Sequence, residues 1–341
     1  MTTITHENGQ YYLRPKEQNN TPIFLSAGLG SLIEELRPDR ESPIHKGSSF
    51  IAPLHAPDTV LTAHKLYIEA GADIITTDTF CASYYRQGGN AELTEKFVTA
   101  ACDIAESARS GLDNAPLIAV SLTSLEDCYS PEATPDIDTL VTEHKRNLAL
   151  LENHGDFTLA ETIPTLHEAA IIAYHARRPF IVSFTVGEDG NLLDGNNVND
   201  VVTTILEPNA LCLGIGVNCC SLEGAKKAVS QLAEIFAQND HLHGKQIIAY
   251  PNGFKKSRAE NNEENSHSCG HHHAPEKLSE IELAGELWDL AARGATAVGG
   301  CCGAGPSHTK AYISKLSDAT NIDLGHLTRI SHAVPVLDAC L

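Results

Sequence analysis

Two short cysteine segments are the part of this chain best suited to chemistry. Cys301 and Cys302 are adjacent and flanked by glycine, and Cys219 and Cys220 follow Asn218. Each pair comes where an apolar, strand-like run ends. Thiolates are the ligands that zinc prefers, whereas adjacent cysteines cannot easily bond to each other without strain. The pattern therefore favours a metal site over a disulfide framework, and Zn2+ is the expected ion.

Three thiolates from these segments predict a particular kind of zinc chemistry. They would leave a tetrahedral ion with one open position, and their negative charge makes the ion a poor activator of water. Such a site can instead bind a substrate thiol, lower its pKa and keep it nucleophilic, which suits alkyl transfer to sulfur. The alternative is a structural zinc whose fourth ligand is Cys269 or a histidine from 267–273. Cys220 should point elsewhere by alternation and serve in packing.

These segments need a scaffold that brings distant strand ends together, and the rest of the chain predicts one. Short apolar, β-branched runs indicate buried strands at 22–27, 73–77, 116–122, 157–160, 180–185, 211–217, 246–250 and 295–298. Segments with apolar residues three or four apart indicate helices at 58–70, 91–111, 138–153, 165–176, 224–237 and 278–292. The alternation, without a break in composition, predicts an α/β fold, a single-domain (β/α)8 TIM barrel over residues 21–320.

In such a barrel the carboxyl ends of the sixth and eighth strands lie on the same rim, one strand apart. Cys219 would then meet Cys301 and Cys302 across roughly eighty residues of sequence. An open doubly wound sheet is the alternative, but no glycine fingerprint for a dinucleotide follows the first strand.

Three segments lie outside this alternation. Residues 1–20 are polar and predict a loose leader or an added strand, and 321–341 form a C-terminal extension. A His-rich loop at 254–277 follows the seventh strand, on the face where such barrels place their sites. The histidines from His267 to His273 are good metal ligands, but their spacing matches no closed zinc motif. We expect a solvated loop; a lid that holds metal in reserve is the alternative.

Composition and charge narrow the partners. The 341 residues include 24 Lys and Arg against 44 Asp and Glu, whereas nucleic acids and anionic membranes attract concentrated positive charge. No apolar stretch has the length of a membrane span, and the first residues lack the features of a signal peptide. Ten cysteines without an export signal are typical of reduced thiols in a cytoplasmic protein. The expected partners are small molecules, neither nucleic acid nor membrane, and the oligomeric state stays open.

Five short motifs, in order and spacing, resemble the homocysteine S-methyltransferase family. The most specific are the two cysteine motifs, Gly216-Val217-Asn218-Cys219 and Gly299-Gly300-Cys301-Cys302-Gly303. Three others support them: Thr77-Asp78-Thr79-Phe80-Cys81-Ala82-Ser83, Glu161-Thr162-Ile163-Pro164 and Tyr250-Pro251-Asn252. The resemblance covers roughly residues 22 to 317.

The resemblance implies a zinc-dependent thiol methyltransferase. Zinc would be held by Cys219, Cys301 and Cys302, with the sulfur of homocysteine as the fourth ligand. For the donor, the leading hypothesis from the chemistry of the site is a sulfonium, S-methylmethionine or S-adenosylmethionine, and the product from homocysteine would be methionine. Because such a donor leaves as a neutral thioether, no catalytic side chain beyond the zinc-activated thiol is expected.

The resemblance also implies roles for residues around the metal. Glu161 would pair with the amino group of the substrate, Asn218 would orient substrate or backbone, and Phe80 would wall the pocket. The alternative for Glu161 is a solvated loop carboxylate, and an aromatic residue at a strand end such as Phe80 is as often simply part of the core.

The first strand departs from the family at Ser26. Family members typically carry an aspartate there, which helps to hold the amino acid, and Ser26 supplies no charge. Losing a charge-assisted hydrogen bond costs about 1.5–3 kcal/mol, or roughly ten- to hundredfold in homocysteine binding. Either Glu161 suffices, with Asp78 as a nearby carboxylate, or the acceptor is a different thiol.

Other functions stay open from the sequence. Betaine as donor would need a cage for its quaternary ammonium group, usually aromatic. A barrel lyase or hydrolase with structural cysteines is one further alternative. A barrel that binds zinc without catalysis is another, and Ser26 favours it.

Overall fold

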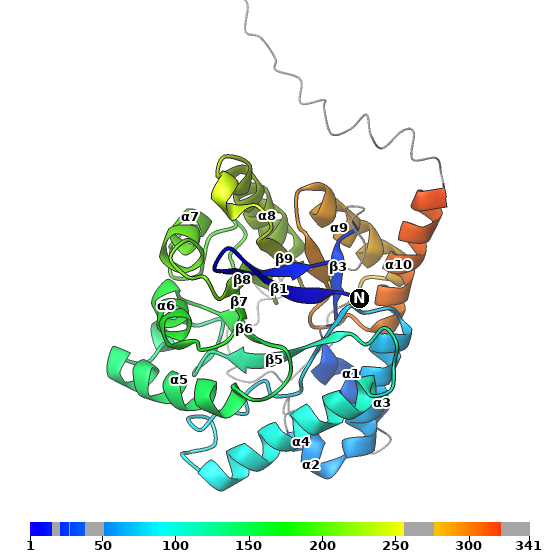
Figure 1. Cartoon of the computed structure of the whole chain (residues 1–341). Coiled ribbons are helices and arrows are strands. Elements are labelled where there is room, and N and C mark those ends of the chain that lie inside the picture. The colour runs from blue at the N-terminus through cyan, green and yellow to red at the C-terminus, as the bar shows by residue number, and fades with distance from the viewer. Residues whose placement is uncertain (16–20, 27, 38–50, 256–275, 322–341) are drawn as a thin grey trace, which may run out of the picture.

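The computed structural model describes residues 1–15, 21–26, 28–37, 51–255 and 276–321, with side chains to 315. Eight parallel strands close a barrel in the order β10-β3-β4-β5-β6-β7-β8-β9 (Figure 1). Their bounds are β3 Ile23–Leu25, β4 Ile74–Thr76, β5 Leu117–Thr123, β6 Phe157–Ile163, β7 Phe180–Phe184, β8 Cys212–Asn218, β9 Gln246–Tyr250 and β10 Ala297–Gly299. Each strand overlaps one of the eight predicted runs, so the predicted (β/α)8 barrel is confirmed.

Helices surround the strands on the outside of the barrel (Figure 1). They are α1 Leu29–Leu36, α2 Ala52–His55, α3 Pro57–Glu69, α4 Ala91–Arg109, α5 Ile137–Leu151, α6 Leu166–His175, α7 Val198–Val201, α8 Leu222–Ala237, α9 Glu280–Ala292 and α10 Pro306–Asn321. The six predicted helices correspond to α3, α4, α5, α6, α8 and α9. Side-chain caps fix several starts: Ser221 accepts from the Gly224 N–H before α8, and Ser279 and Glu282 form a capping box at α9.

Two layers of buried side chains hold the barrel. Inside the ring, residues such as Ile23, Leu159 and Ile248 pack against one another. Between strands and helices, a larger apolar cluster includes Val182 and Leu283. Because both faces of each strand are covered, the strands read as continuous apolar runs, as parallel strands should.

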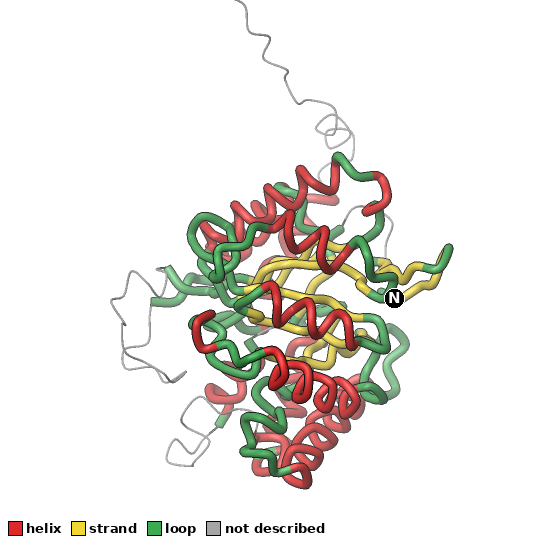
Figure 2. Tube along the Cα trace, turned by 90° about the vertical axis from the view of Figure 1, so that its left-hand side faces the viewer, coloured by secondary structure: helices red, strands yellow, loops and turns green. Residues whose placement is uncertain are grey.

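The first fifteen residues form a β-hairpin, the added-strand alternative of the sequence. Strands β1 (Thr3–Glu7) and β2 (Gln10–Arg14) pair antiparallel across Asn8 and Gly9, both with positive φ, a favoured hairpin turn. In Figure 2 the hairpin lies at the right-hand end of the barrel. Leu13 is fully buried against the inner cluster, and the Gln246 side-chain amide donates to its carbonyl at 2.8 Å. The hairpin therefore closes the amino-terminal end of the ring.

The long loop after β9 begins and ends at a short antiparallel bridge between Phe254 and Lys277. The backbone N–H of Lys255 donates to the Glu276 carbonyl at 2.9 Å, which pins the two ends together. Residues 256–275, with His267 to His273, lie outside the described residues, as does the extension from 322. No helix in the described part of the chain is long and apolar enough to cross a membrane.

Candidate metal and substrate site

Three cysteine sulfurs meet at the carboxyl ends of β8 and β10. The Sγ atoms of Cys219, Cys301 and Cys302 all lie within 4.8 Å of one another, and those of Cys219 and Cys302 are 3.7 Å apart. Two sulfurs on one tetrahedral zinc, each about 2.3 Å from the ion, would be separated by about 3.8 Å. The structure brings the two predicted segments together at a spacing that fits a zinc ion.

The segment that continues β9 holds the two cysteine turns beside each other. On one side, the Cys219 N–H donates to the Tyr250 carbonyl at 3.2 Å. On the other side, the Cys301 N–H donates to the Pro251 carbonyl at 2.7 Å. Because β9 lies between β8 and β10 in the barrel, one short segment of backbone sets the distance between both turns.

Unusual backbone brings the turns this close. Cys219 has a φ of 53°, in the left-handed region that non-glycine residues seldom adopt. Gly28, at the start of α1, has a φ of 72°, and a Cβ there would lie 2.5 Å from the carbonyl oxygen of Cys301. Only glycine therefore lets the turn after β3 pack directly against the Cys301 turn.

The environment of the sulfurs disfavours thiolates unless a cation is bound. Hydrogen bonding with Cys219 and Cys302, together with burial, raises the pKa of Cys301 well above the usual thiol value. Three thiolates at this spacing would repel one another, and a bound cation offsets that repulsion. Cys220 lies in the outer apolar cluster, where burial raises its pKa to about 12, so it packs as the alternation predicts.

Glu161 lies on β6, inside the barrel wall. Its side chain is 9 % exposed, so the solvated-loop interpretation of this carboxylate is wrong. The hydroxyl of Ser121 donates to Oε1, and the Tyr250 hydroxyl donates to Oε2 at 3.2 Å. Burial raises the pKa of Glu161 to about 7, against the lowering effect of these two donors. The carboxyl group is thus held in one orientation and changes charge near neutrality.

Asn218 is fully buried at the end of β8 and fixes the neighbouring strand end. Its Oδ1 accepts from the Thr162 N–H at 2.9 Å, and Thr162 has a φ of 56°. The Nδ2 of Asn218 is buried without a hydrogen-bond partner among the described residues. Asn218 therefore stabilises Thr162, the left-handed residue next to Glu161, and its Nδ2 group can still donate a hydrogen bond to a ligand.

The residues predicted at the first strand and after the second lie in the barrel wall or in the turn that follows it. Ser26 is buried; its Oγ accepts from the Thr76 N–H at 3.2 Å, and its carbonyl accepts from the Thr76 hydroxyl. Asp78 is buried, and Phe80 is half-buried in the turn after β4. The hydroxyl of Ser26 therefore accepts a hydrogen bond within the barrel wall and adds no negative charge to the site.

Two residues that contact the site were not found from the sequence. Ser121 had a weak signal, since it is polar within the apolar run of β5 and meets Glu161. Tyr129, in the loop after β5, had none. Its hydroxyl lies 3.1 Å from the Cys219 sulfur and 2.9 Å from the Cys219 carbonyl oxygen. Burial and the adjacent Cys219 raise the pKa of Tyr129 well above its usual value, so the phenol keeps its proton.

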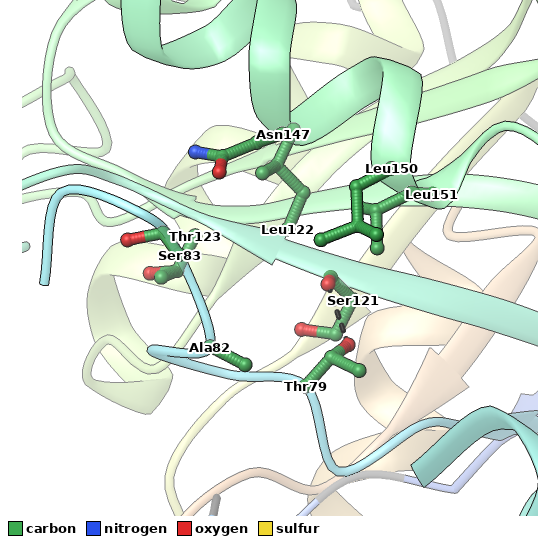
Figure 3. A pocket seen from close by; sticks show the side chains of 9 residues that line it. All are labelled: Thr79, Ala82, Ser83, Ser121, Leu122, Thr123, Asn147, Leu150 and Leu151. Atoms are coloured by element: carbon green, nitrogen blue, oxygen red, sulfur yellow. Dashed lines mark hydrogen bonds between the residues drawn. The ribbon is translucent and has the colours of Figure 1, made fainter. Parts of the chain in front are cut away.

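A small cavity lies behind β5, between this strand, α5 and the turn after β4 (Figure 3). Its volume of about 10 Å³ has room for about one water molecule. Beside the cavity, the Thr79 hydroxyl donates a hydrogen bond to the Ser121 carbonyl at 2.7 Å. The cavity lies behind the site and is too small for an amino acid, so it is not the substrate pocket.

Comparison with known proteins agrees with this geometry. The family model described as homocysteine S-methyltransferase matches residues 23–316. Homocysteine S-methyltransferase 1 of Brassica oleracea var. italica is 26 % identical over 297 residues, which cover 79 % of this chain and 86 % of that protein. Selenocysteine Se-methyltransferase of the same plant is 22 % identical over 334 residues, covering 86 % and 88 %.

A solved structure shares the fold. The homocysteine methyltransferase MmuM from Escherichia coli, in its metallated form, superposes with a TM-score of 0.68 at 19 % identity, covering 86 % of this chain and 96 % of that one. At this identity the likeness is one of fold, the same closed barrel. Since the family match runs from β3 into α10 and includes both cysteine turns, this chain is a methyltransferase that belongs to the homocysteine S-methyltransferase family.

Proposed function

We propose that this methyltransferase moves a methyl group from a sulfonium donor, S-methylmethionine or S-adenosylmethionine, to the sulfur of homocysteine. The product is methionine. The observation that carries the proposal is the cluster of three sulfurs within 4.8 Å at the carboxyl ends of the strands. A zinc ion held by Cys219, Cys301 and Cys302 would lower the pKa of a substrate thiol and keep it as a thiolate at neutral pH.

Side chains beside the sulfurs would hold the amino acid. The carboxylate of Glu161 accepts hydrogen bonds from Ser121 and Tyr250 and keeps lone pairs for the substrate ammonium group. Asn218 Nδ2 is a buried donor for the substrate carboxylate or sulfur. Phe80, half-buried after β4, would form a wall of the pocket.

The methyl transfer itself requires little else from the protein. The substrate thiolate attacks the methyl carbon, a new C–S bond forms, and the C–S bond of the sulfonium breaks. The electron pair stays on the donor sulfur, which leaves as a neutral thioether, so no general acid is needed. Reducing surroundings would keep the three ligand thiols from oxidising, and we therefore propose a cytoplasmic location.

A second acceptor class has one observation in its favour. Ser26 stands where the family carries an aspartate, and its hydroxyl accepts from Thr76 in the barrel wall. With one anionic contact fewer, Glu161 carries more of the binding to the ammonium group. An acceptor thiol other than homocysteine is therefore the second candidate.

A donor and acceptor matrix tests both. The zinc-loaded protein is incubated with homocysteine carrying a carbon isotope label and with unlabelled S-methylmethionine. We expect one labelled methionine from the acceptor and one unlabelled methionine from the donor per turnover. Turnover with another thiol but not with homocysteine would favour the second acceptor class. No turnover with any thiol and either sulfonium donor would reject the proposal.

A further inference from the structure

The loop after β5 reaches across the barrel mouth to Cys219, a ligand in the proposed zinc site. Tyr129 is separated from Cys219 by 90 positions in the chain, yet its hydroxyl lies 3.1 Å from the sulfur. The same hydroxyl lies 2.9 Å from the Cys219 carbonyl oxygen. None of the five motifs includes Tyr129, and the proposed reaction assigns it no role.

The local chemistry favours the sulfur as the acceptor. The Cys219 carbonyl already accepts from the side-chain amide of Asn252 at 3.0 Å. A phenol has one proton to donate, and a thiolate sulfur can only accept. When Cys219 is a thiolate, the bond from Tyr129 becomes charge-assisted and so stronger than the bond to a neutral carbonyl.

The loop that carries Tyr129 is braced close to this residue. Asp127 accepts from the Tyr129 N–H at 3.1 Å and from the Ser130 hydroxyl at 3.0 Å. These bonds hold the backbone at Tyr129 and the side chain of the residue after it. The loop is therefore braced by hydrogen bonds that do not involve the three cysteines.

The base of the loop is hydrogen-bonded to a buried carboxyl group. The Leu125 N–H donates to Oε1 of Glu168 at 2.9 Å, and the same oxygen lies 2.9 Å from Nε2 of His144. Glu168 is in the first turn of α6, where the helix amide groups favour a carboxylate. Arg86, from the turn after β4, donates to the carbonyls of Ser124 and Glu126 on the other side.

We propose that Tyr129 is a positioning residue that donates a hydrogen bond to the Cys219 sulfur. This bond fixes the direction of the sulfur and withdraws electron density from it. Partners of this kind, one step outside the ligands, typically change metal affinity or activity by about ten- to a hundredfold when removed. The inference rests on the proposed function in one respect, that Cys219 is a metal ligand.

The test is Tyr129→Phe, with Tyr85→Phe as the matched control. The Tyr85 hydroxyl donates to Oε1 of Glu126 at 2.8 Å, so both variants remove one phenol hydrogen bond at the same loop. Only the first removes a bond to sulfur. Co2+ is bound in place of zinc, and the sulfur-to-cobalt charge-transfer absorption is recorded. Zinc affinity is measured separately by competition with a chelator.

We expect Tyr129→Phe to move the charge-transfer band to longer wavelength, because sulfur lone pairs rise in energy without the hydrogen bond. We also expect zinc binding to weaken by roughly tenfold or more. Tyr85→Phe should match the wild type in both. If the two variants give the same spectrum and affinity, the proposal is overturned.

These readouts separate the inference from the proposed function. Wild-type protein that binds Co2+ through sulfur but transfers no methyl group would reject the reaction and leave the Tyr129 shift testable. Wild-type protein without a sulfur-to-cobalt band would overturn the role of Tyr129, since Cys219 would then not be a ligand.

Discussion

The two ends of the barrel are built in opposite ways. At the amino-terminal end, the hairpin covers the ring, and Lys245 Nζ donates to Gln10, Tyr11 and Cys212 at 2.7–3.0 Å. At the carboxyl end, buried polar atoms of Asn218 and Asn252 have no hydrogen-bond partner among the described residues. The hairpin supplies acceptors for the buried Lys245 ammonium group, whereas the carboxyl end has unused hydrogen-bonding capacity that a ligand could satisfy.

Backbone conformation follows a similar division, apart from Asn8 in the hairpin turn, where a positive φ is favoured. Cys81, Thr162 and Cys219 have φ between 53° and 66°, and all three lie at or just beyond the carboxyl ends of strands. Strained residues of this kind persist where surrounding structure holds them, and they gather at functional sites. The amino-terminal end, which the hairpin closes, contributes stability. The carboxyl end, which is the open end, holds strained residues and unpaired polar groups that substrate and metal would use.

Removing a sulfur from the open end should have the largest effect. We expect Cys302→Ala to lose stoichiometric zinc and to lower methyl transfer by roughly three orders of magnitude, because two thiolates cannot complete the ligand set. Metal analysis and turnover are measured together. Cys220→Ala is the control: it removes a neighbouring buried thiol that packs in the apolar cluster, and it should keep its zinc. A Cys302→Ala protein with full zinc content would refute the proposed ligand set.

A change at the closed end should affect stability and leave chemistry alone. Leu13→Ala removes a fully buried side chain of the inner cluster and should lower the free energy of unfolding by about 2–5 kcal/mol. Urea unfolding measures the loss, while KM for homocysteine and zinc affinity should stay near wild type. If zinc affinity fell as well, the two ends would be coupled and the division above would fail.

Replacing the Glu161 carboxylate at the open end should selectively lower kcat/KM for the thiol that carries an amino group. Glu161→Gln keeps the shape but loses the charge that would face the ammonium group, so kcat/KM for homocysteine should fall about ten- to hundredfold. The same variant should lose little with 4-mercaptobutanoate, which has the thiol but no amino group. Equal losses with both thiols would mean that Glu161 acts on the scaffold and not on the ammonium.

Much of this architecture could be predicted from the chain, for identifiable reasons. Buried parallel strands are continuous apolar runs, and strand order alone places Cys219 and Cys301 on the same rim, one strand apart. Glu161 was predicted beyond its strand, because the polar side chain ends the apolar run while β6 continues to Ile163.

Other features depend on contacts that no local pattern carries. The hairpin had a turn signal in Asn8-Gly9, but its strands lack the continuous apolar runs of the barrel strands, and only docking under the barrel buries Leu13. Tyr129 is placed by bonds of its loop to Glu168 and Arg86, residues more than thirty positions away. Such long-range bracing explains why the ligands could be predicted and their supporting residue could not.

The smallest expected effect is a pH dependence at the open end. Burial raises the pKa of Glu161 to about 7, so the neutral acid dominates below that pH and cannot pair with the ammonium group. We expect kcat/KM for homocysteine to be about tenfold lower at pH 6 than its plateau above pH 8, from this group alone. The free energy of unfolding changes with pH in the opposite direction. Because folding raises the pKa of Glu161 above its usual value of 4.5, this group makes the folded protein less stable as the pH rises from 4.5 through 7.

Substrate thiol ionisation also varies with pH, so the wild-type profile alone does not isolate Glu161. The decisive comparison is the ratio of homocysteine to 4-mercaptobutanoate turnover, measured from pH 6 to 8.5 in wild type and in Glu161→Gln. In the wild type this ratio should rise through pH 7, because only homocysteine has the ammonium that senses the carboxylate. In the variant the ratio should be flat. A rising ratio in both proteins would assign the ionisation to another group and would leave Glu161 as part of the barrel wall.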